Sequence, residues 1–340
     1  MLDKNLEFSN ILVLNFGQLG DVILSFPVMS AIREKFPNAK ITFMGGKAVA
    51  EIVKLSGYSD AQIVVDRVKL RDSAKLWSIR QIFKLIGEVR REKFDFVIDL
   101  HSLSETNLLG FLSGAKKRLY SNRENRSLDF LSNFRPRPPL EDKSKHIAER
   151  YLDIIKPLEI ENVKKIVQIT PNQNDLEFVE NLWQKHKLEK SVIGLFPGAG
   201  HLSRRWSLQN FSILAEFLSQ RDSHQIAVFL GPEERDLRGE IEKIFPAKTV
   251  IFDNLNLGQF VAALSKLSGF VSNDTGPVHL AAAVGIPIVM LLKRSDFDSY
   301  HFSPLATHLR LLGKEEIDDI NPEDVYQAVN ELLTEKNSSF

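Results

Sequence analysis

The sequence of 340 residues contains no cysteine. This excludes disulfides, thiolate metal sites and a cysteine nucleophile. Long apolar runs are also absent, since no segment approaches the roughly 18 apolar residues needed to span a bilayer. The opening stretch MLDKNLEFSN has neither the basic lead nor the apolar core of a secretion signal. We therefore expect a cytoplasmic protein, whose contact with the inner membrane would have to be peripheral.

A surplus of either charge is missing as well. Lys plus Arg and Asp plus Glu both number 44, so the formal net charge is zero. This argues against a general nucleic-acid binder, which needs a surplus of cations to face phosphates. Hydrophobic residues make up 43% and charged residues 26%, the balance of a globular protein. The length suits two domains better than one.

In the first half, short apolar runs alternate with amphipathic segments. Strands are predicted at Ile11–Leu14, Ile41–Met44, Ile63–Val65 and Phe96–Leu100, and helices at Asp21–Phe36, Ile79–Arg91 and His146–Leu158. This alternation predicts a parallel, doubly wound sheet. The polar, basic and proline-bearing stretch 121–145 interrupts it and is predicted to be a loop or a partly ordered insertion.

A second series of the same kind follows. Strands are predicted at Val192–Phe196, Ile226–Leu230, Val250–Phe252, Phe270–Ser272 and Ile288–Leu292, and helices at Leu208–Gln220, Glu233–Ile244 and Pro322–Thr334, before a frayed tail at Glu335–Phe340. The predicted fold is α/β, with two Rossmann-like domains, 1–165 and 166–340, facing each other across a cleft. Helix 322–334 could pack back on the first domain.

The first segment with chemical potential, NFGQLGD, spans residues 15–21 between a strand and a helix. Its glycines allow a ligand to approach the backbone. The dinucleotide pattern G-x-G-x-x-G fails, because Leu19 occupies the place of its second glycine. Asp21 either caps the helix or presents a carboxylate at the carboxyl edge of the sheet, where it could take a proton from an acceptor hydroxyl. Gln18 and Gly20 are candidate acceptor contacts beside it.

The second segment, FPGAGHLSRRWS, follows a buried strand. The turn Pro197-Gly198-Ala199-Gly200 offers open backbone amides at the three residues after Pro197, which has no N–H of its own. These amides and the forked donors of the Arg204 guanidinium suit a diphosphate. The alternative is a surface loop whose arginines are solvated.

The third segment contains Asp274, Thr275, Gly276, Pro277 and His279. The chain turns after a strand, and Pro277 takes a first-turn helix position that needs no amide donor. Free amides and the helix dipole there predict an anion site. His279 lies in or near the first turn, either beside the ligand or as a structural histidine.

Two weaker signals accompany these. Glu234 follows a strand in the stretch GPEER and could hold sugar hydroxyls, or could simply begin a solvated helix. Lys116 and Arg118 form a basic patch that an anionic acceptor or a membrane surface could contact. The arginines downstream that would extend this patch are Arg123, Arg126, Arg135 and Arg137. A solvated charged loop is the alternative.

Together these segments resemble the heptosyltransferases of glycosyltransferase family 9, which build the inner core of lipopolysaccharide. The matching stretches include GQLGDVILSFPVMSAIREKFPNAKITF, FDFVIDLHSLSETNLLGFLSGAKKR, HIAERYL, FPGAGHLSRRWSLQNFSILAEFL, VFLGPEERDL and SNDTGPVHLAAAVGIPIVMLL. They cover nearly the whole chain, apart from residues 121–145 and the tail.

The resemblance implies a GT-B fold, with the acceptor on the first domain and the nucleotide-sugar on the second. It implies inverting transfer without a metal or other cofactor, from a donor expected to be ADP-heptose to an anionic glycolipid or glycan at the inner face of the membrane. Asp21 matches the family's general base, and Glu234 matches the glutamate near the donor's ribose. Asp274-Thr275-Gly276 and His279 match its donor-phosphate motif. Arg204 stands where a lysine is usual.

Two departures concern the acceptor. The lead Asn15-Phe16-Gly17-Gln18 replaces a commoner basic one, and His101, a further candidate acceptor contact, stands where many relatives carry Gln. Two rival functions remain at this point. A nucleotide-sugar epimerase of the same architecture could use His101, His201 and His279 as acid and base groups. A non-catalytic sugar-nucleotide or glycan binding protein would keep the phosphate site and need no Asp21.

Overall fold

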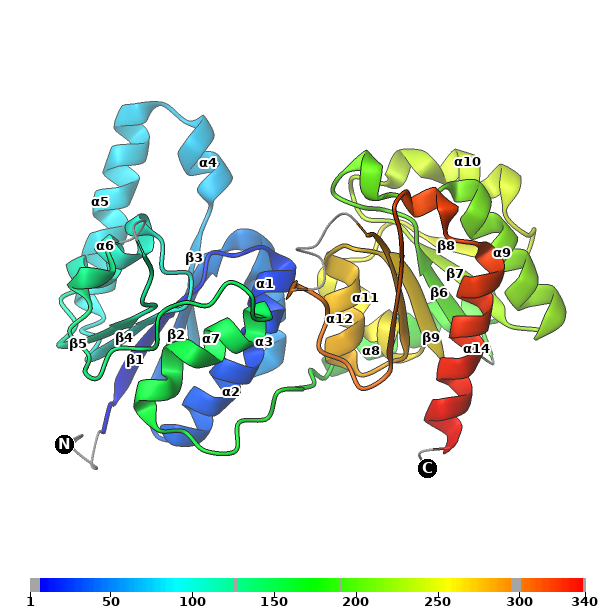
Figure 1. The fold of residues 1–340 in the computed structure, drawn as a ribbon. Coiled ribbons are helices and arrows are strands. Elements are labelled where there is room, and N and C mark those ends of the chain that lie inside the picture. Colours follow the sequence, from blue (N-terminus) through cyan, green and yellow to red (C-terminus); the bar gives the residue numbers. More distant parts are fainter. Residues whose placement is uncertain (1–6, 125–127, 190, 295–300, 339–340) are drawn as a thin grey trace. The chain divides into compact units, whose positions relative to one another are not determined.

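The computed structural model describes residues 7–124, 128–189, 191–294 and 301–338. The chain divides into two compact units, Met1–Val167 and Gln168–Phe340, and each contains one parallel sheet (Figure 1). The division lies two residues from the boundary expected after residue 165. The predicted fold class, two Rossmann-like α/β domains of the GT-B type, is confirmed.

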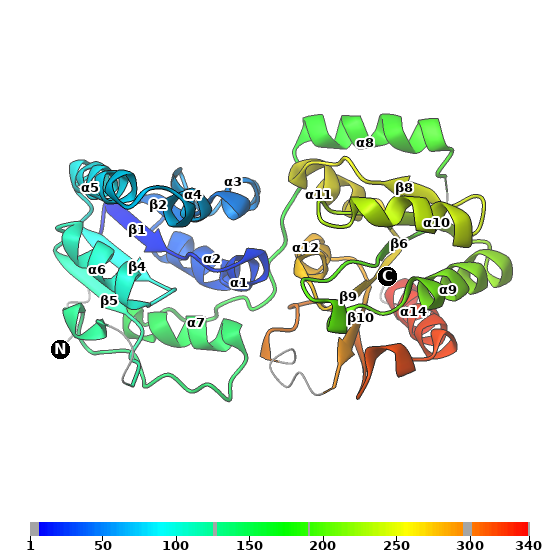
Figure 2. The same cartoon turned by 90° about the horizontal axis from the view of Figure 1, so that it is seen from above.

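The sheet of the first unit has the strand order β3-β2-β1-β4-β5, all parallel. Its strands are β1 (Asn10–Leu14), β2 (Lys40–Gly46), β3 (Ala61–Val65), β4 (Phe96–Asp99) and β5 (Lys117–Tyr120). Its helices are α1 (Leu19–Leu24), α2 (Phe26–Lys35), α3 (Ala50–Ser56), α4 (Arg67–Asp72), α5 (Lys75–Arg91), α6 (Ser104–Leu112) and α7 (Ile147–Ile155). Val89 of α5 packs with Leu12, Leu14 and Val97 of the sheet. Helices α2 and α7 contact each other (Figure 2).

The sheet of the second unit has the order β11-β10-β9-β6-β7-β8 and is also parallel throughout. Its strands are β6 (Val192–Phe196), β7 (Gln225–Phe229), β8 (Val250–Phe252), β9 (Gly269–Asn273), β10 (Ile288–Lys293) and β11 (Leu309–Lys314). Its helices are α8 (Gln173–His186), α9 (Leu208–Arg221), α10 (Arg238–Ile244), α11 (Leu257–Ser265), α12 (Gly276–Val284) and α14 (Pro322–Ser338).

The final helix belongs to the core of the second unit. Val325, Val329 and Leu332 are buried in one cluster with Phe211 and Leu214 of α9, and α14 also contacts β9, β10 and β11. The helix continues to Ser338, through most of the stretch expected to be a frayed tail. The contacts with α9 and with the sheet lie within the second unit. The sequence had left open that helix 322–334 packs on the first domain instead.

The first predicted helix, Asp21–Phe36, is instead two helices that meet at Ser25. Pro27, at the start of α2, lacks the amide hydrogen that would continue α1, and its ring would clash with the carbonyl four residues back. The Ser25 hydroxyl donates to the carbonyl of Val22 at 2.7 Å. The break ends the short helix that carries Asp21.

The segment 121–145 contains ordered, paired cations. Arg123 forms an ion pair with Glu141, and Arg137 forms one with Asp129 at 2.7 Å. The Arg135 guanidinium donates to the carbonyl of Phe134. Arg126 lies outside the described residues. The expectation of a free basic patch here therefore does not hold for Arg123 and Arg137, which are paired with carboxylates, whereas Arg135 bonds to backbone carbonyls.

In both sheets the strand order reverses beside the first strand of the unit. From β1 the chain proceeds through β2 to β3, then returns to place β4 on the other side of β1. From β6 it proceeds through β7 to β8, then returns to place β9 on the other side of β6. In open parallel sheets, ligands bind at the carboxyl ends of the strands at such a switch point. No helix among the described residues is long and apolar enough to cross a membrane.

Candidate functional site

Asp21 lies in the first turn of α1, just past the carboxyl end of β1. Its Oδ2 accepts a hydrogen bond from the backbone N–H of Gln18 at 2.9 Å. Gln18 is the residue that precedes the helix, and Asp21 is the third residue within it. The expectation that Asp21 itself is the N-cap is thus wrong, although its carboxylate does stabilise the start of the helix. A side chain at Gly17 would collide with Asp21, 2.5 Å from its Cβ, so this glycine leaves room for the carboxylate.

Burial raises the pKa of Asp21 above its usual value. The hydrogen bond from Gln18 and the nearby Arg150 charge act in the opposite direction but do not cancel that effect. Burial and the Asp21 charge also raise the pKa of Tyr151, whereas the nearby Asn15 side chain acts to lower it. A carboxylate with a raised pKa is a stronger base than an ordinary aspartate.

His101 follows β4, the strand that pairs with β1. Its backbone N–H donates to the carbonyl of Leu14 at 3.3 Å, so the residue lies at the same sheet edge as Asp21. Burial, with Arg67 and Arg123 nearby, lowers the pKa of His101 to about 4. The ring is therefore neutral at pH 7. It lines a cavity of about 230 Å³ together with Phe16, Arg67, Leu70, Leu103, Glu105, Thr106 and Leu109.

A buried carboxylate holds the His101 loop in place. Asp99 accepts hydrogen bonds from the Ser102 backbone N–H and from the Asn107 side chain, both at 2.8 Å. Burial raises its pKa to about 6. Asp99 was not singled out in the sequence, because a carboxylate at a strand end has no distinguishing pattern.

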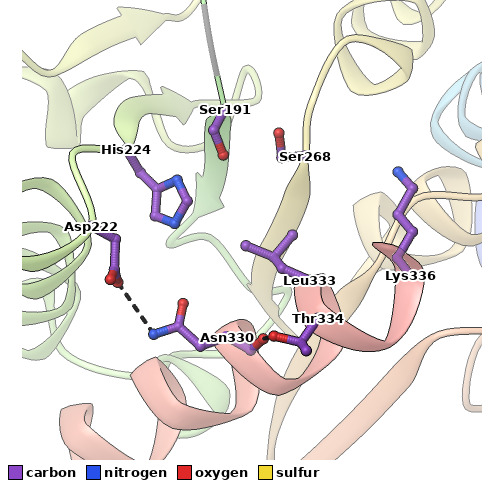
Figure 3. Close-up of a pocket in the computed structure, with 8 residues that line it drawn as sticks. All are labelled: Ser191, Asp222, His224, Ser268, Asn330, Leu333, Thr334 and Lys336. Atoms are coloured by element: carbon purple, nitrogen blue, oxygen red, sulfur yellow. Dashed lines mark hydrogen bonds between the residues drawn. The ribbon is translucent and has the colours of Figure 1, made fainter. Parts of the chain in front are cut away.

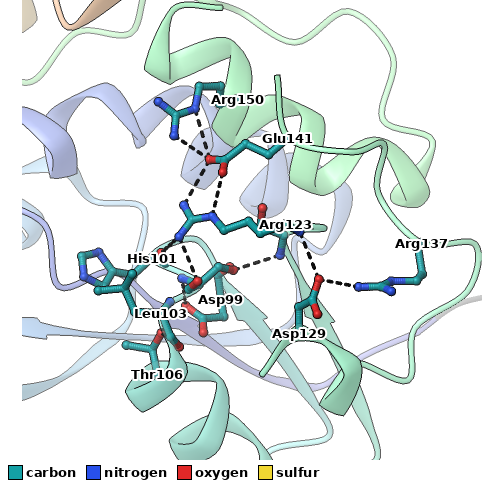
Figure 4. Close-up of polar contacts among 11 residues, drawn as sticks. Asp99, His101, Leu103, Thr106, Arg123, Asp129, Arg137, Glu141 and Arg150 are labelled. Atoms are coloured by element: carbon teal, nitrogen blue, oxygen red, sulfur yellow. Dashed lines mark hydrogen bonds and ion pairs between the residues drawn. The ribbon is translucent and has the colours of Figure 1, made fainter. Parts of the chain in front are cut away.

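Two arginines share one carboxylate beside this edge (Figure 4). Glu141 lies 3.0 Å from Arg123 Nε and 2.5 Å from an Arg150 guanidinium nitrogen. Arg123 also donates to the carbonyls of His101 and Ser102. These three residues help to line a cavity of about 620 Å³, whose lining also includes Glu124, Asp142 and Lys143, so its formal charges balance. Arg150 lies in the matched stretch HIAERYL and Glu141 in a segment with no recognisable motif, and nothing in the sequence indicated that the two side chains pair.

The structure places Gln18 and Gly20 beside Asp21 but does not bring Lys116 or Arg118 there. Lys117 begins β5 and pairs with Phe96, the first residue of β4, so Lys116 lies at the amino edge of the sheet. Arg118 lies in strand β5, and not in the solvated loop that was the alternative to a basic patch. Its guanidinium donates to the carbonyls of Leu131 and Ala115.

In the second unit, the loop after β6 contains Pro197, Gly198 and Ala199, which are buried, and Gly200, which is exposed. Arg205 holds this loop, since two of its guanidinium nitrogens donate to the carbonyl of Ala199, each at 3.2 Å.

The loop after β9 meets the loop after β6. Arg204 lies 3.7 Å from the Asp274 carboxylate. Thr275 is the N-cap of α12, Gly276 and Pro277 form its first turn, and His279 is buried one turn in. The N-terminus of α12 therefore lies beside the Arg204 guanidinium, which is the arrangement that suits an anionic ligand.

Glu234 follows β7, the strand on the other side of β6. Its side chain is buried, and a side chain at Gly198 or Gly231 would collide with it at 2.5 Å and 2.7 Å. Burial raises its pKa, while Arg205, 3.8 Å away, lowers it. The PGAG loop with Arg204, the Asp274–His279 segment and Glu234 thus follow β6, β9 and β7, whose carboxyl ends are adjacent in the sheet.

Asn273, a fully buried residue at the end of β9, joins two of these segments. Its Nδ2 donates to the carbonyls of Pro197 at 2.9 Å and Gly198 at 3.2 Å. Its Oδ1 accepts from the backbone N–H of Trp206 at 3.1 Å, and the Trp206 indole donates to the carbonyl of Ile320. Asn273 lies within the matched stretch SNDTG, but only the structure identifies its partners.

A separate cavity of about 600 Å³ opens at the other edge of this sheet (Figure 3). Its lining includes Ser191, His224 and Ser268, which precede β6, β7 and β9. It contains none of the predicted site residues. Within the described part of the chain, no group of three or more His, Asp or Glu side chains is placed to hold a metal ion.

Comparison with known proteins identifies the family. Residues 82–328 match the model of glycosyltransferase family 9 (heptosyltransferase). The chain belongs to this family. It is therefore a glycosyltransferase, as the sequence resemblance predicted.

Individual relatives agree with this assignment. The chain is 24% identical over 344 residues to lipopolysaccharide heptosyltransferase 3 of Escherichia coli K12, covering 93% of this chain and 96% of the relative. Its fold resembles a family 9 glycosyl transferase from Veillonella parvula (TM-score 0.85, 22% identity, 97% and 98% coverage). It also resembles E. coli heptosyltransferase WaaC with ADP (TM-score 0.76, 19% identity, 95% and 99% coverage). A putative UDP-N-acetylglucosamine 2-epimerase from Listeria monocytogenes shares the fold less closely, with a TM-score of 0.55.

Replacing Asn273 tests its part in joining the loops. Asn273→Ala leaves the Trp206 N–H and the Pro197 carbonyl without their partner, so unfolding should require about 1–3 kcal/mol less free energy. Amide hydrogen exchange should also accelerate across 197–206. Denaturant unfolding and exchange mass spectrometry measure these effects. Ser272→Ala is the control, because within the described part of the chain its hydroxyl bonds to the adjacent Asn273 carbonyl and to neither loop. Equal exchange in both variants would contradict this role.

Proposed function

We propose that the enzyme transfers a heptose from ADP-heptose to a lipopolysaccharide core or a related surface glycan, with inversion and without a metal. The observation that carries this proposal is the meeting of the PGAG loop, Arg204 and the start of α12 at the β6–β9 switch point. The E. coli relatives support it, since one is a lipopolysaccharide heptosyltransferase and another is a heptosyltransferase solved with ADP.

The donor is proposed to bind the second unit. The diphosphate would accept hydrogen bonds from the open amides of Gly198–Gly200 and of the first turn of α12, and from the Arg204 guanidinium. His279 lies one turn inside that helix, where it would support this turn. Glu234 is proposed to accept hydrogen bonds from the donor's ribose. These groups neutralise the charge that develops on the departing diphosphate, so the reaction needs no metal.

Asp21 is proposed to be the general base. The acceptor oxygen forms a bond to the anomeric carbon on the face opposite the leaving group, while the bond from that carbon to the diphosphate oxygen breaks. Asp21 takes the hydroxyl proton, and the nucleoside diphosphate departs with the bonding electrons. The raised pKa of Asp21 suits this task.

The acceptor is proposed to bind at the edge formed by Gln18, Gly20 and His101. Arg123 and Arg150 are the cations beside this edge that we propose meet an anionic acceptor, within a cavity whose acidic and basic residues balance in number. We further propose that this acceptor is a glycolipid at the inner face of the membrane, which the enzyme meets as a cytoplasmic, peripheral protein. Lys116 and Arg118 remain predicted contacts only for an acceptor that extends beyond this edge.

Membership of a glycosyltransferase family decides between the functions considered from the sequence. Family membership favours glycosyl transfer over epimerisation, and the fold of the epimerase resembles that of this chain less closely than the family 9 structures do. It also favours an enzyme over a non-catalytic binding protein.

Replacing Arg204 tests donor binding. Arg204→Ala should weaken ADP binding by about 1.5–3 kcal/mol, because a charge-assisted hydrogen bond to the diphosphate is lost. Isothermal titration measures this change. Arg221→Ala is the matched control, since the Arg221 side chain is 43% exposed against 42% for Arg204 and lies away from the site. Unchanged affinity in Arg204→Ala would remove this residue from the donor site.

Chelation tests the proposed independence from metal. Turnover with ADP-heptose should be unchanged in EDTA, because amides and Arg204 supply the charge neutralisation. Initial rates with and without the chelator measure this directly. A rate lost in EDTA and restored by Mg²⁺ or Mn²⁺ would contradict the proposal.

Replacing Asp21 tests the general base. Asp21→Asn should lower turnover by about 10²–10⁴-fold and leave ADP affinity unchanged. The acid limb of the wild-type pH–rate profile, where the base becomes protonated as the pH falls, should disappear. Because the folded-state pKa of Asp21 is raised, its ionised form lowers stability at neutral pH. The melting temperature of the variant should therefore not fall.

The control is Asp66→Asn at the N-cap of α4, another aspartate at a helix start in the first unit, which accepts a hydrogen bond from the Lys69 N–H at 3.0 Å. It should retain near-normal turnover. If a folded, ADP-binding Asp21→Asn protein kept the wild-type rate, the base would lie elsewhere, and His101 would be the next candidate.

A further inference from the structure

Helices α4 and α5 form a helical hairpin, residues 67–91, that exposes large apolar side chains. The two helices project from the first unit (Figure 1). Leu76 is 84% exposed and Phe83 is 70% exposed. The other exposed large apolar residues of the hairpin are Val68, Trp77, Ile79 and Ile82. Large exposed apolar groups on a soluble protein mark interaction surfaces.

Two different faces of α5 are apolar. Leu85 and Val89, four residues apart, pack against the sheet. Leu76, Ile79 and Phe83 recur at spacings of three and four residues, so they share another face, which is exposed. Packing within the first unit therefore accounts for only one of the two faces.

The hairpin is also strongly basic, although the chain as a whole has no net charge. Residues 67–91 contain eight Lys or Arg and two Asp or Glu, a formal charge of +6. One of the acidic residues, Asp72, is neutralised locally by Arg71 at 2.7 Å. Arg80 and Lys84, four residues apart, are exposed on the same helix as the apolar face.

The hairpin adjoins the candidate acceptor edge. It begins directly after β3, so α4 lies at the carboxyl ends of the strands, as His101 does. Arg67 and Leu70 of α4 line the same cavity as His101, and the Arg67 guanidinium donates to the carbonyl of Phe16 at 2.8 Å. Any partner surface that binds the hairpin would therefore place its own molecules close to the His101 cavity.

We propose that the α4–α5 hairpin docks the enzyme on an anionic lipid bilayer, with Leu76, Ile79 and Phe83 inserted between headgroups. Exposed apolar and aromatic side chains combined with Lys and Arg are the composition of helices that lie in a membrane interface. Anionic headgroups complement the charge of +6. A second copy of the chain fits poorly, because a two-fold interface through this face would oppose two such charges.

This inference rests on the proposed function only in taking the acceptor to be a glycolipid. It assigns membrane contact to a surface different from the basic patch around Lys116. A bilayer held at the hairpin would present lipid headgroups beside the His101 cavity while the acyl chains stay in the membrane.

Vesicle sedimentation of the full chain, without donor or acceptor, tests the docking. Wild type should bind vesicles of phosphatidylglycerol and phosphatidylcholine in equal parts and should not bind phosphatidylcholine alone. Phe83→Ser should weaken binding about tenfold, because one inserted aromatic side chain is lost. A triple variant, Lys75→Gln, Arg80→Gln and Lys84→Gln, should weaken it about a hundredfold, at about fivefold for each charge.

Matched controls separate the hairpin from general effects. Phe130→Ser removes another phenylalanine that is 70% exposed in the same unit. Lys35→Gln, Lys54→Gln and Lys117→Gln together remove three exposed charges elsewhere in that unit. Both should bind anionic vesicles like wild type. Circular dichroism melts verify that every variant is folded.

Three results would overturn the proposal: no binding to anionic vesicles, equal binding to both vesicle types, or equal losses in hairpin and control variants. A dimer of wild type that Phe83→Ser dissociates in sedimentation analysis would instead assign the face to a second copy. ADP titration of the same variants keeps the two hypotheses apart. Intact ADP binding without vesicle binding would refute the docking alone, and vesicle binding without ADP binding would refute the donor site.

Discussion

The constraint on which both candidate sites depend is the reversal of strand order beside β1 and beside β6. At each reversal, the segments that follow two neighbouring parallel strands run in opposite directions along the sheet. This leaves space for a ligand at the carboxyl ends of the two strands. Asp21 follows β1 and His101 follows β4 at one reversal. Arg204 follows β6 and Asp274 follows β9 at the other. Residues far apart in the sequence therefore meet because of the topology.

Buried polar side chains fix the loops at these edges. Asn273 bonds two loop carbonyls and one amide, and Asp99 bonds the Ser102 amide and the Asn107 side chain. Glu234 occupies the space that Gly198 leaves free. A buried polar group without partners is costly, so each of these side chains favours one loop arrangement over its alternatives. The loops that would meet a ligand are thereby held in place before it arrives.

Most of the sheet was predictable, because buried parallel strands are continuous apolar runs bounded by turns. Strands β6 and β8 coincide with their predicted ranges. The missed strands lie at the sheet edges. Strand β5 has the polar start Lys117-Arg118, and β11 is only partly buried. Edge strands bury less surface, and their hydrophobic signal is correspondingly weak.

Those parts of the candidate site that contain a sequence motif could be predicted. Those parts that arise only from tertiary packing could not. Glycine-rich turns after strands indicated the loops at Gly198 and Gly276. The pairing of Arg150 with Glu141 and the burial of Glu234 depend on segments that meet only in the folded chain. Charge alone misled at Arg118, since nothing in a run of basic residues distinguishes a free cation from one bonded to backbone carbonyls.

The hydrogen bond from Trp206 to Ile320 has a consequence for the order of events during synthesis on the ribosome. The sheet of the first unit is complete once Tyr120 has emerged, so this unit can fold while the rest is being translated. The loop after β6 cannot be completed then, because its partners at Asp318 and Ile320 emerge near the end of the chain. The nascent protein should thus acquire its Asp21 edge early and its Arg204 edge only after nearly the whole chain has left the ribosome.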